Sequence, residues 1–110
     1  MELKRVVVTG LGALTPVGNN VAETWDNLVK GVSGAGPITH FDASKFKTHF
    51  ACEVKNFNGT DYIDRKELRK MDLYTQYAIA AAKEAVEDSG MDLEKEDLNR
   101  IGVIYGVGIG

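Results

Sequence analysis

The chain has 110 residues, of which 44% are hydrophobic and 26% are charged, and its formal net charge is −3. This composition is that of one folded globular domain or part of one, which excludes a disordered tail. No apolar run approaches the ~20 residues of a membrane-spanning helix, and the negative charge gives no overall attraction to nucleic acid or to an anionic membrane. The single cysteine, Cys52, has no disulfide partner and no neighbour at metal-ligand spacing, so we expect a cytoplasmic protein without bound metal.

Two β-branched runs predict strands near the two ends of the chain. Residues 5–10 read R-V-V-V-T-G, and residues 100–107 read R-I-G-V-I-Y-G-V. Continuous apolar runs of this kind are typical of strands that are buried on both faces of a parallel or mixed sheet. A third run, residues 50–54, predicts an edge strand within the glycine-rich segment 31–59, which is otherwise expected to be loop.

Two shorter helices are predicted between these strands. The first covers residues 21–30, because Asn20 can cap its N-terminus and Gly31 can end it. Its apolar face is formed by Trp25, Leu28 and Val29. The second covers residues 61–70 and is rich in charge.

A third helix, Leu73–Ser89, is predicted to be the strongest, with Asp72 as its cap and Gly90 after its end. Apolar and small side chains occupy nearly every face of its first turns, so we expect this part to be buried all round inside a layered α/β structure. A sheet of so few strands cannot cover such a helix, and we therefore expect the chain to be part of a larger domain. The alternative is a small complete α/β domain that oligomerisation completes.

The glycines that follow the first strand invite a nucleotide-binding interpretation, which their spacing does not support. Thr9-Gly10-Leu11-Gly12 begins a G-x-G-x-x-G pattern, but the third glycine would fall at Thr15, and Pro16 follows. The next helix starts several residues later, so a phosphate would meet no helix N-terminus. The pattern indicates a glycine-rich turn, and a nucleotide-dependent reductase is only a distant alternative.

The residues that could act as nucleophile or base stand in unsuitable settings. Cys52 lies in the predicted edge strand next to Glu53, whose negative charge would disfavour a thiolate. His40 and His49 have no carboxylate or cysteine partner at a motif spacing, so we expect ordinary loop histidines. No catalytic residue is therefore assigned to this chain.

A cationic ridge is predicted on the second helix, since four of the six residues at 65–70 are positively charged: Arg65, Lys66, Arg69 and Lys70. On a helix these side chains form i,i+4 neighbours, an arrangement suited to phosphate or carboxylate groups. The alternative is a solvated helix face whose charges pair with Asp61, Asp64 and Asp72. Charge pattern alone leaves both open.

The sequence resembles the start of the type II β-ketoacyl-[acyl-carrier-protein] synthases over essentially its whole length. The resemblance rests on R-V-V-V-T-G-L-G-A-L-T-P-V-G-N from residue 5, T-W at 24, I-x-H-F-D from 38, D-R-K-E-x-R-K-M-D from 64, R-I-G from 100 and G-x-G-I-G from 106. Jointly and in this order these segments are highly specific for the family.

The resemblance implies that residues 1–110 are the N-terminal portion of a β-ketoacyl synthase N-terminal domain, which is part of the first half of a thiolase-like α-β-α-β-α layered fold. It further implies a homodimeric acyltransferase of fatty-acid synthesis that uses neither metal nor organic cofactor. That enzyme moves an acyl group from acyl carrier protein to a cysteine and condenses it with malonyl-carrier protein, with loss of carbon dioxide. Its cysteine and two histidines lie in motifs absent from these 110 residues, so the chain alone is predicted to be inactive. The alternative is a non-catalytic carrier-protein-binding module.

Two features carry over from the family by position. Lys66, Arg69 and Lys70 match the surface that docks the acidic carrier protein. Gly108 and Ile109 match a segment that lines the acyl-chain pocket, where the bulk of Ile109 would limit chain length. Neither nucleic acid nor membrane is implied as a partner.

Overall fold

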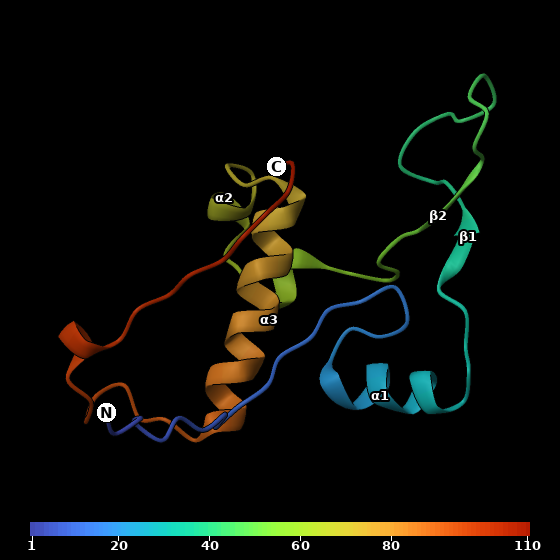
Figure 1. Cartoon of the computed structure of the whole chain (residues 1–110). Coiled ribbons are helices and arrows are strands. Elements are labelled where there is room, and N and C mark those ends of the chain that lie inside the picture. Colours follow the sequence, from blue (N-terminus) through green and yellow to red (C-terminus); the bar gives the residue numbers. More distant parts are fainter. The chain divides into compact units, whose positions relative to one another are not determined.

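The computed structural model describes all residues, 1–110 (Figure 1). In chain order its elements are helix α1 (Val21–Val29), strands β1 (Ala35–Pro37) and β2 (Phe50–Cys52), 3-10 helix η1 (Gly59–Asp61), helices α2 (Arg65–Leu68) and α3 (Leu73–Ser89), and 3-10 helix η2 (Leu98–Arg100). They form two compact units: unit 1 comprises Met1–Gly12 and Gly59–Gly110, and unit 2 comprises Ala13–Asn58. None of the helices has both the length and the apolar character needed to cross a membrane.

The ends of α1 and α3 confirm the predicted helices. The Asn20 side chain accepts a hydrogen bond of 2.8 Å from the backbone N–H of Glu23, which caps α1 as expected. Gly31 and Gly90 follow the two helices with φ values of 69° and 67°, a left-handed conformation that favours glycine and ends a helix. Asp72 precedes α3 as predicted, although its side chain forms no capping hydrogen bond.

The predicted helix at 61–70 is broken into two short pieces, and this prediction is corrected. The Asp64 side chain accepts a hydrogen bond of 3.3 Å from the Lys66 N–H, so the α-helix begins only at Arg65. The backbone N–H groups of Lys70 and Met71 then bond to carbonyls three residues earlier, at 3.0 and 3.2 Å. Such tight bonds are typical of a terminating helix, and α2 is therefore a single turn.

Unit 2 contains the two-stranded sheet. β1 and β2 are antiparallel, with Ala35 opposite Cys52 and Pro37 opposite Phe50. The predicted edge strand is thus confirmed over Phe50–Cys52, whereas β1 was missed because Gly36 and Pro37 are residues typical of turns.

Helix α1 turns its polar side toward the rest of unit 2. The Thr24 hydroxyl lies 3.1 Å from that of Thr15, and Asn27 Nδ2 donates to the Val17 carbonyl at 2.6 Å. The apolar face predicted for this helix, Trp25, Leu28 and Val29, is exposed.

The two predicted buried strands at the chain ends are wrong for this structure. Neither residues 5–10 nor residues 100–107 form a strand, and Val6 and Ile104 are 88% and 98% exposed. A strand exists only where a neighbouring strand receives its hydrogen bonds, and neither segment meets one here. The full burial predicted for the first turns of α3 is also wrong for this structure, since Ala80, 4% exposed, is the only buried residue of the helix.

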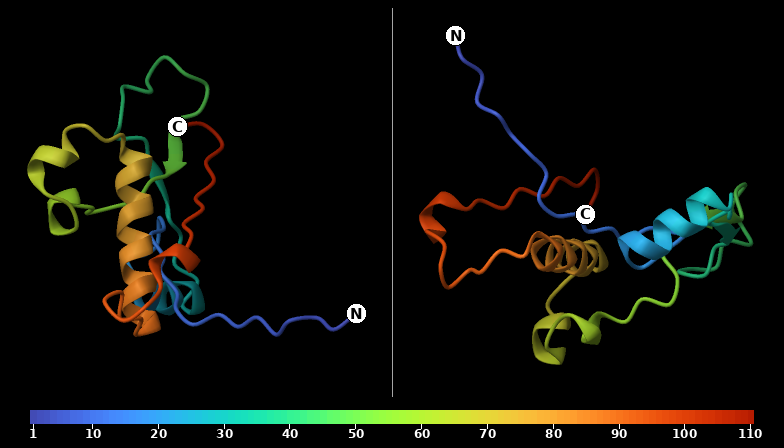
Figure 2. Two further views of the ribbon diagram at one scale, coloured as in Figure 1. Left: turned by 90° about the vertical axis from the view of Figure 1, so that its left-hand side faces the viewer. Right: turned by 90° about the horizontal axis from the view of Figure 1, so that it is seen from below.

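The glycine-rich segment crosses the small-residue face of α3 within unit 1. A Cβ atom at Gly12 would collide with the Ala81 carbonyl oxygen, and one at Gly10 would lie 2.7 Å from the Ser89 nitrogen. Figure 2 shows this segment beside the C-terminal half of α3. The glycines therefore permit a close backbone contact with a helix, which gives a structural reason for their presence that involves no phosphate.

We predict that Gly12→Ala destabilises unit 1. The added methyl group would meet helix backbone that cannot move aside, and overpacking of this kind costs about 1–3 kcal/mol. Chemical denaturation monitored by circular dichroism measures the loss. Gly102→Ala is the matched control, because a Cβ atom there meets nothing within 4 Å; equal stability of the two variants would contradict the close contact.

Candidate functional site

The cationic ridge lies on the single turn of α2 and on the residues directly after it, and all four of its side chains are exposed. Lys70 Nζ forms an ion pair with Glu67 Oε1 at 3.1 Å. Arg65, Lys66 and Arg69 have no ion-pair partner in the chain. The pairing with Asp61, Asp64 and Asp72 that would make the ridge a self-neutralised face is not formed.

Local packing explains why the turn presents its cations outward. Leu68 is the one apolar residue of α2, and a Cβ atom at Gly59 would lie 2.5 Å from its Cδ1 atom. The Gln76 side chain donates a hydrogen bond of 3.3 Å to the Met71 carbonyl and so holds the junction with α3. Because Leu68 packs against η1 and Asp64 caps the turn, the charged residues remain on the solvent side.

The predicted acyl-pocket residues lie in the extended C-terminal segment of unit 1. Ile109 is 95% exposed, and a Cβ atom at Gly108 would meet no atom within 4 Å. No neighbouring side chains form pocket walls around these two residues in this chain. Figures 1 and 2 show the segment returning toward the N-terminal end of α3, where Gly110 lies against the Tyr74 ring.

Glu53 organises a polar cluster that the sequence did not reveal. Its carboxylate accepts a hydrogen bond of 2.7 Å from the Thr39 hydroxyl and one of 3.0 Å from the Thr39 N–H, which together hold the pKa of Glu53 below its usual range. His40 Nε2 lies 3.8 Å from the same carboxylate. Glu53 is 13 residues from His40 in the sequence, a separation that matches no catalytic motif. The carboxylate thereby fastens the segment after β1, which is a structural task. Cys52 is exposed on β2.

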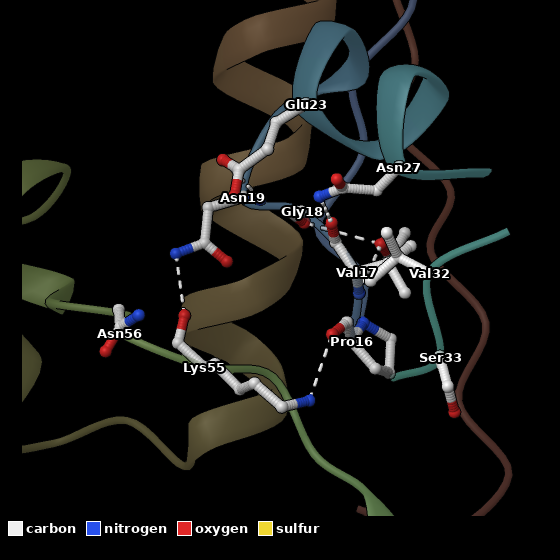
Figure 3. Close-up of a pocket in the computed structure, with 11 residues that line it drawn as sticks. Pro16, Val17, Gly18, Asn19, Glu23, Asn27, Val32, Ser33, Lys55 and Asn56 are labelled. Atoms are coloured by element: carbon white, nitrogen blue, oxygen red, sulfur yellow. Dashed lines mark hydrogen bonds between the residues drawn. The ribbon is translucent and has the colours of Figure 1, made fainter. Parts of the chain in front are cut away.

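A cavity of about 320 Å³ lies in unit 2, between the turn at residues 15–19, helix α1 and Lys55 (Figure 3). Asn19 Nδ2 donates to the Lys55 carbonyl at 2.8 Å. Lys55 Nζ in turn donates to the carbonyls of Pro16, Gly34 and Glu53 at 3.0, 2.7 and 3.0 Å. Sequence reasoning missed this arrangement because its members are single polar residues spread over about 40 positions, with no recurring spacing.

Comparison with known proteins decides the family. A sequence model described as "Beta-ketoacyl synthase, N-terminal domain" matches residues 3–110. The chain belongs to this family. The resemblance found from the sequence motifs is confirmed, and with it the assignment of these elements to part of a thiolase-like α/β fold.

Relatives of this β-ketoacyl synthase chain are much longer than 110 residues. It is 54% identical to the 3-oxoacyl-[acyl-carrier-protein] synthase 2 of Staphylococcus aureus (strain COL) over 107 residues, which are 97% of this chain and 26% of the relative. It is 51% identical to the enzyme of the same name from Vibrio harveyi over 110 residues, again 26% of the relative. The chain thus spans about a quarter of the length of these curated relatives.

Solved structures with the same fold include two ketosynthases. The ishigamide ketosynthase/chain length factor superposes with a TM-score of 0.74 and 41% identity, over 80% of this chain and 22% of the other. A second match, with a TM-score of 0.67 and 29% identity over 86% of this chain and 24% of the other, is AntDE:AntF, described as a type II PKS acyl-carrier protein in complex with its ketosynthase bound to the hexaketide.

Proposed function

We propose that this chain is the amino-terminal part of a β-ketoacyl-[acyl-carrier-protein] synthase of fatty-acid synthesis. The observation that carries the proposal is the 54% identity, over 97% of the chain, to a relative named 3-oxoacyl-[acyl-carrier-protein] synthase 2. In the whole enzyme, the acyl group of an acyl-carrier-protein thioester passes to a cysteine thiol. Malonyl-carrier protein then loses carbon dioxide, and the resulting carbanion attacks the cysteine thioester, forming the carbon–carbon bond and releasing the thiolate.

Within this reaction the 110 residues have a docking and lining role, and the nucleophilic cysteine and two histidines belong to other parts of the enzyme. Lys66, Arg69 and Lys70 receive the acidic carrier protein, and the unpaired charges of Lys66 and Arg69 support this role. Gly108 and Ile109 line the acyl-chain pocket when the rest of the domain surrounds them. The enzyme is a cytoplasmic homodimer that works without metal or organic cofactor.

A chimeric enzyme tests the proposed reaction. The aligned 107 residues of the Staphylococcus aureus synthase are replaced by this chain, and release of labelled carbon dioxide from malonyl-carrier protein is measured with an acyl-carrier-protein donor. We expect the chimera to condense the two substrates and the 110-residue chain alone to release no carbon dioxide. A chimera that is folded and dimeric but inactive would contradict the proposal.

Carrier-protein binding tests the docking role of the ridge. In the chimera, Lys66→Glu combined with Arg69→Glu should weaken carrier-protein affinity on the order of tenfold, because two attractive charges become repulsive ones. The loss should shrink as salt screens the charges. Titration calorimetry measures both effects.

The control for the ridge is Lys45→Glu combined with Lys47→Glu, which makes the same change of net charge on exposed residues of unit 2. Equal weakening by both pairs would show that overall charge, and not the ridge, attracts the partner.

Titration of the 110-residue chain with carrier protein, with amide hydrogen exchange to establish that the chain is folded, distinguishes part of an enzyme from a self-sufficient binding module. Salt-sensitive binding by a chain with protected amides would favour the module.

Chain-length selection tests the pocket role of Ile109. In the chimera, Ile109→Phe should lower kcat/KM for long acyl donors more than for short ones, because the larger ring overfills the pocket, at a typical cost of about 1–3 kcal/mol. Parallel assays with short and long acyl-carrier proteins give the ratio. If the variant kept the wild-type ratio of kcat/KM for long and short donors, the proposed pocket role of Ile109 would be wrong.

A further inference from the structure

Lys55 occupies a site built from backbone carbonyl groups. Its ammonium group donates to three of them, those of Pro16, Gly34 and Glu53, at distances of 3.0, 2.7 and 3.0 Å. An ammonium group has three N–H donors, so every donor of Lys55 has an acceptor inside unit 2. Figure 3 shows its side chain extended along the cavity toward Pro16.

The partners of Lys55 differ in kind and in sequence distance from those of the lysines that form ion pairs. Lys30, Lys70 and Lys95 pair with a carboxylate three or four residues away, contacts that need no tertiary structure. The three carbonyls around Lys55 come from three separate segments, two of them 39 and 21 residues distant. Bonds from a charged donor to neutral carbonyls are stronger than neutral ones, and here they join segments that only the fold brings together.

The backbone of Lys55 holds the same turn as its side chain does. Its carbonyl accepts a hydrogen bond of 2.8 Å from Asn19 Nδ2, while its Nζ binds the Pro16 carbonyl. The turn at residues 15–19, which forms one wall of the cavity, is therefore fastened at both ends by one residue. Asn56, the next residue, has φ of 56°, a left-handed conformation that asparagine adopts more readily than most other non-glycine residues.

We propose that these three carbonyls form a primary-ammonium binding site that Lys55 fills in the native chain, and that its occupancy sets the position of the turn at residues 15–19 and the shape of the cavity. Lys55 is thus a positioning residue. When its side chain is shortened, the site is available to a small primary ammonium ion from solution. The inference goes beyond the proposed function and does not rest on it.

The test compares two variants of the 110-residue chain. Lys55→Met keeps most of the apolar stem and loses the ammonium group, and we expect the thermal midpoint to fall by about 5–10 °C. Lys55→Ala vacates the site, and ethylammonium or propylammonium chloride should restore at least half of its lost midpoint. Circular dichroism, which follows the loss of helix, gives the thermal midpoint.

Tetramethylammonium chloride at equal ionic strength is the control ligand, because it has the same charge but no N–H donor. Lys30→Ala is the control variant, since Lys30 pairs locally with Asp26 at 2.6 Å. Rescue should also restore hydrogen-exchange protection of the Asn19 side-chain amide. If Lys55→Ala is unfolded, refolding by propylammonium supports the site and no refolding overturns it. Equal effects of the two salts, equal effects on Lys30→Ala, or an unchanged midpoint for Lys55→Met would each overturn it.

Discussion

The close contact between the glycine-rich segment and helix α3 determines which surfaces of unit 1 are covered and which remain exposed. Backbone atoms at residues 10–12 lie against the alanine face of the helix, at distances that leave no room for a β-carbon. The Leu11 N–H adds a hydrogen bond of 2.9 Å to Asp88 Oδ2, which fixes the direction of the crossing. With this face covered, Val86 of α3 and the β-branched residues Val6, Val7 and Val8 before Gly10 remain exposed. The exposed apolar surface of unit 1 follows from that arrangement.

Some charged residues have hydrogen-bond partners within the chain, whereas others have none and are free to bind a partner molecule. Lys55 and Glu53 have their donors or acceptors occupied by backbone groups or by Thr39, and both hold segments together. Lys66 and Arg69 have no such partner. A cation without an internal partner breaks no hydrogen bond within the protein when it binds an external anion, whereas Lys55 would have to give up three. This difference supports the proposed carrier-protein docking at the ridge and a structural role for Lys55.

Local patterns predicted the helices well and the sheet poorly. The caps and glycines around α1 and α3 act within one helical turn, so their effect is visible in the sequence. The break before α2 was missed because the sequence does not show whether Asp64 lies within a helix or caps the start of one. β1 was missed because a three-residue strand containing glycine and proline is defined by its partner β2 and not by its own residues. The strands predicted at the chain ends fail here because no neighbouring strand is present to pair with them.

The amino-acid sequence by itself determined the family, the bounds of the two longer helices and the position of the cationic ridge, since each depends on residue types at short spacing. Only the tertiary structure decided that the ridge is not neutralised by its neighbouring aspartates, and that glycines at 10 and 12 serve helix contact. It also decided that Lys55, Glu53 and their partners meet. These outcomes depend on contacts between residues up to about 80 positions apart, and such contacts arise from the path of the whole chain, which no local spacing records.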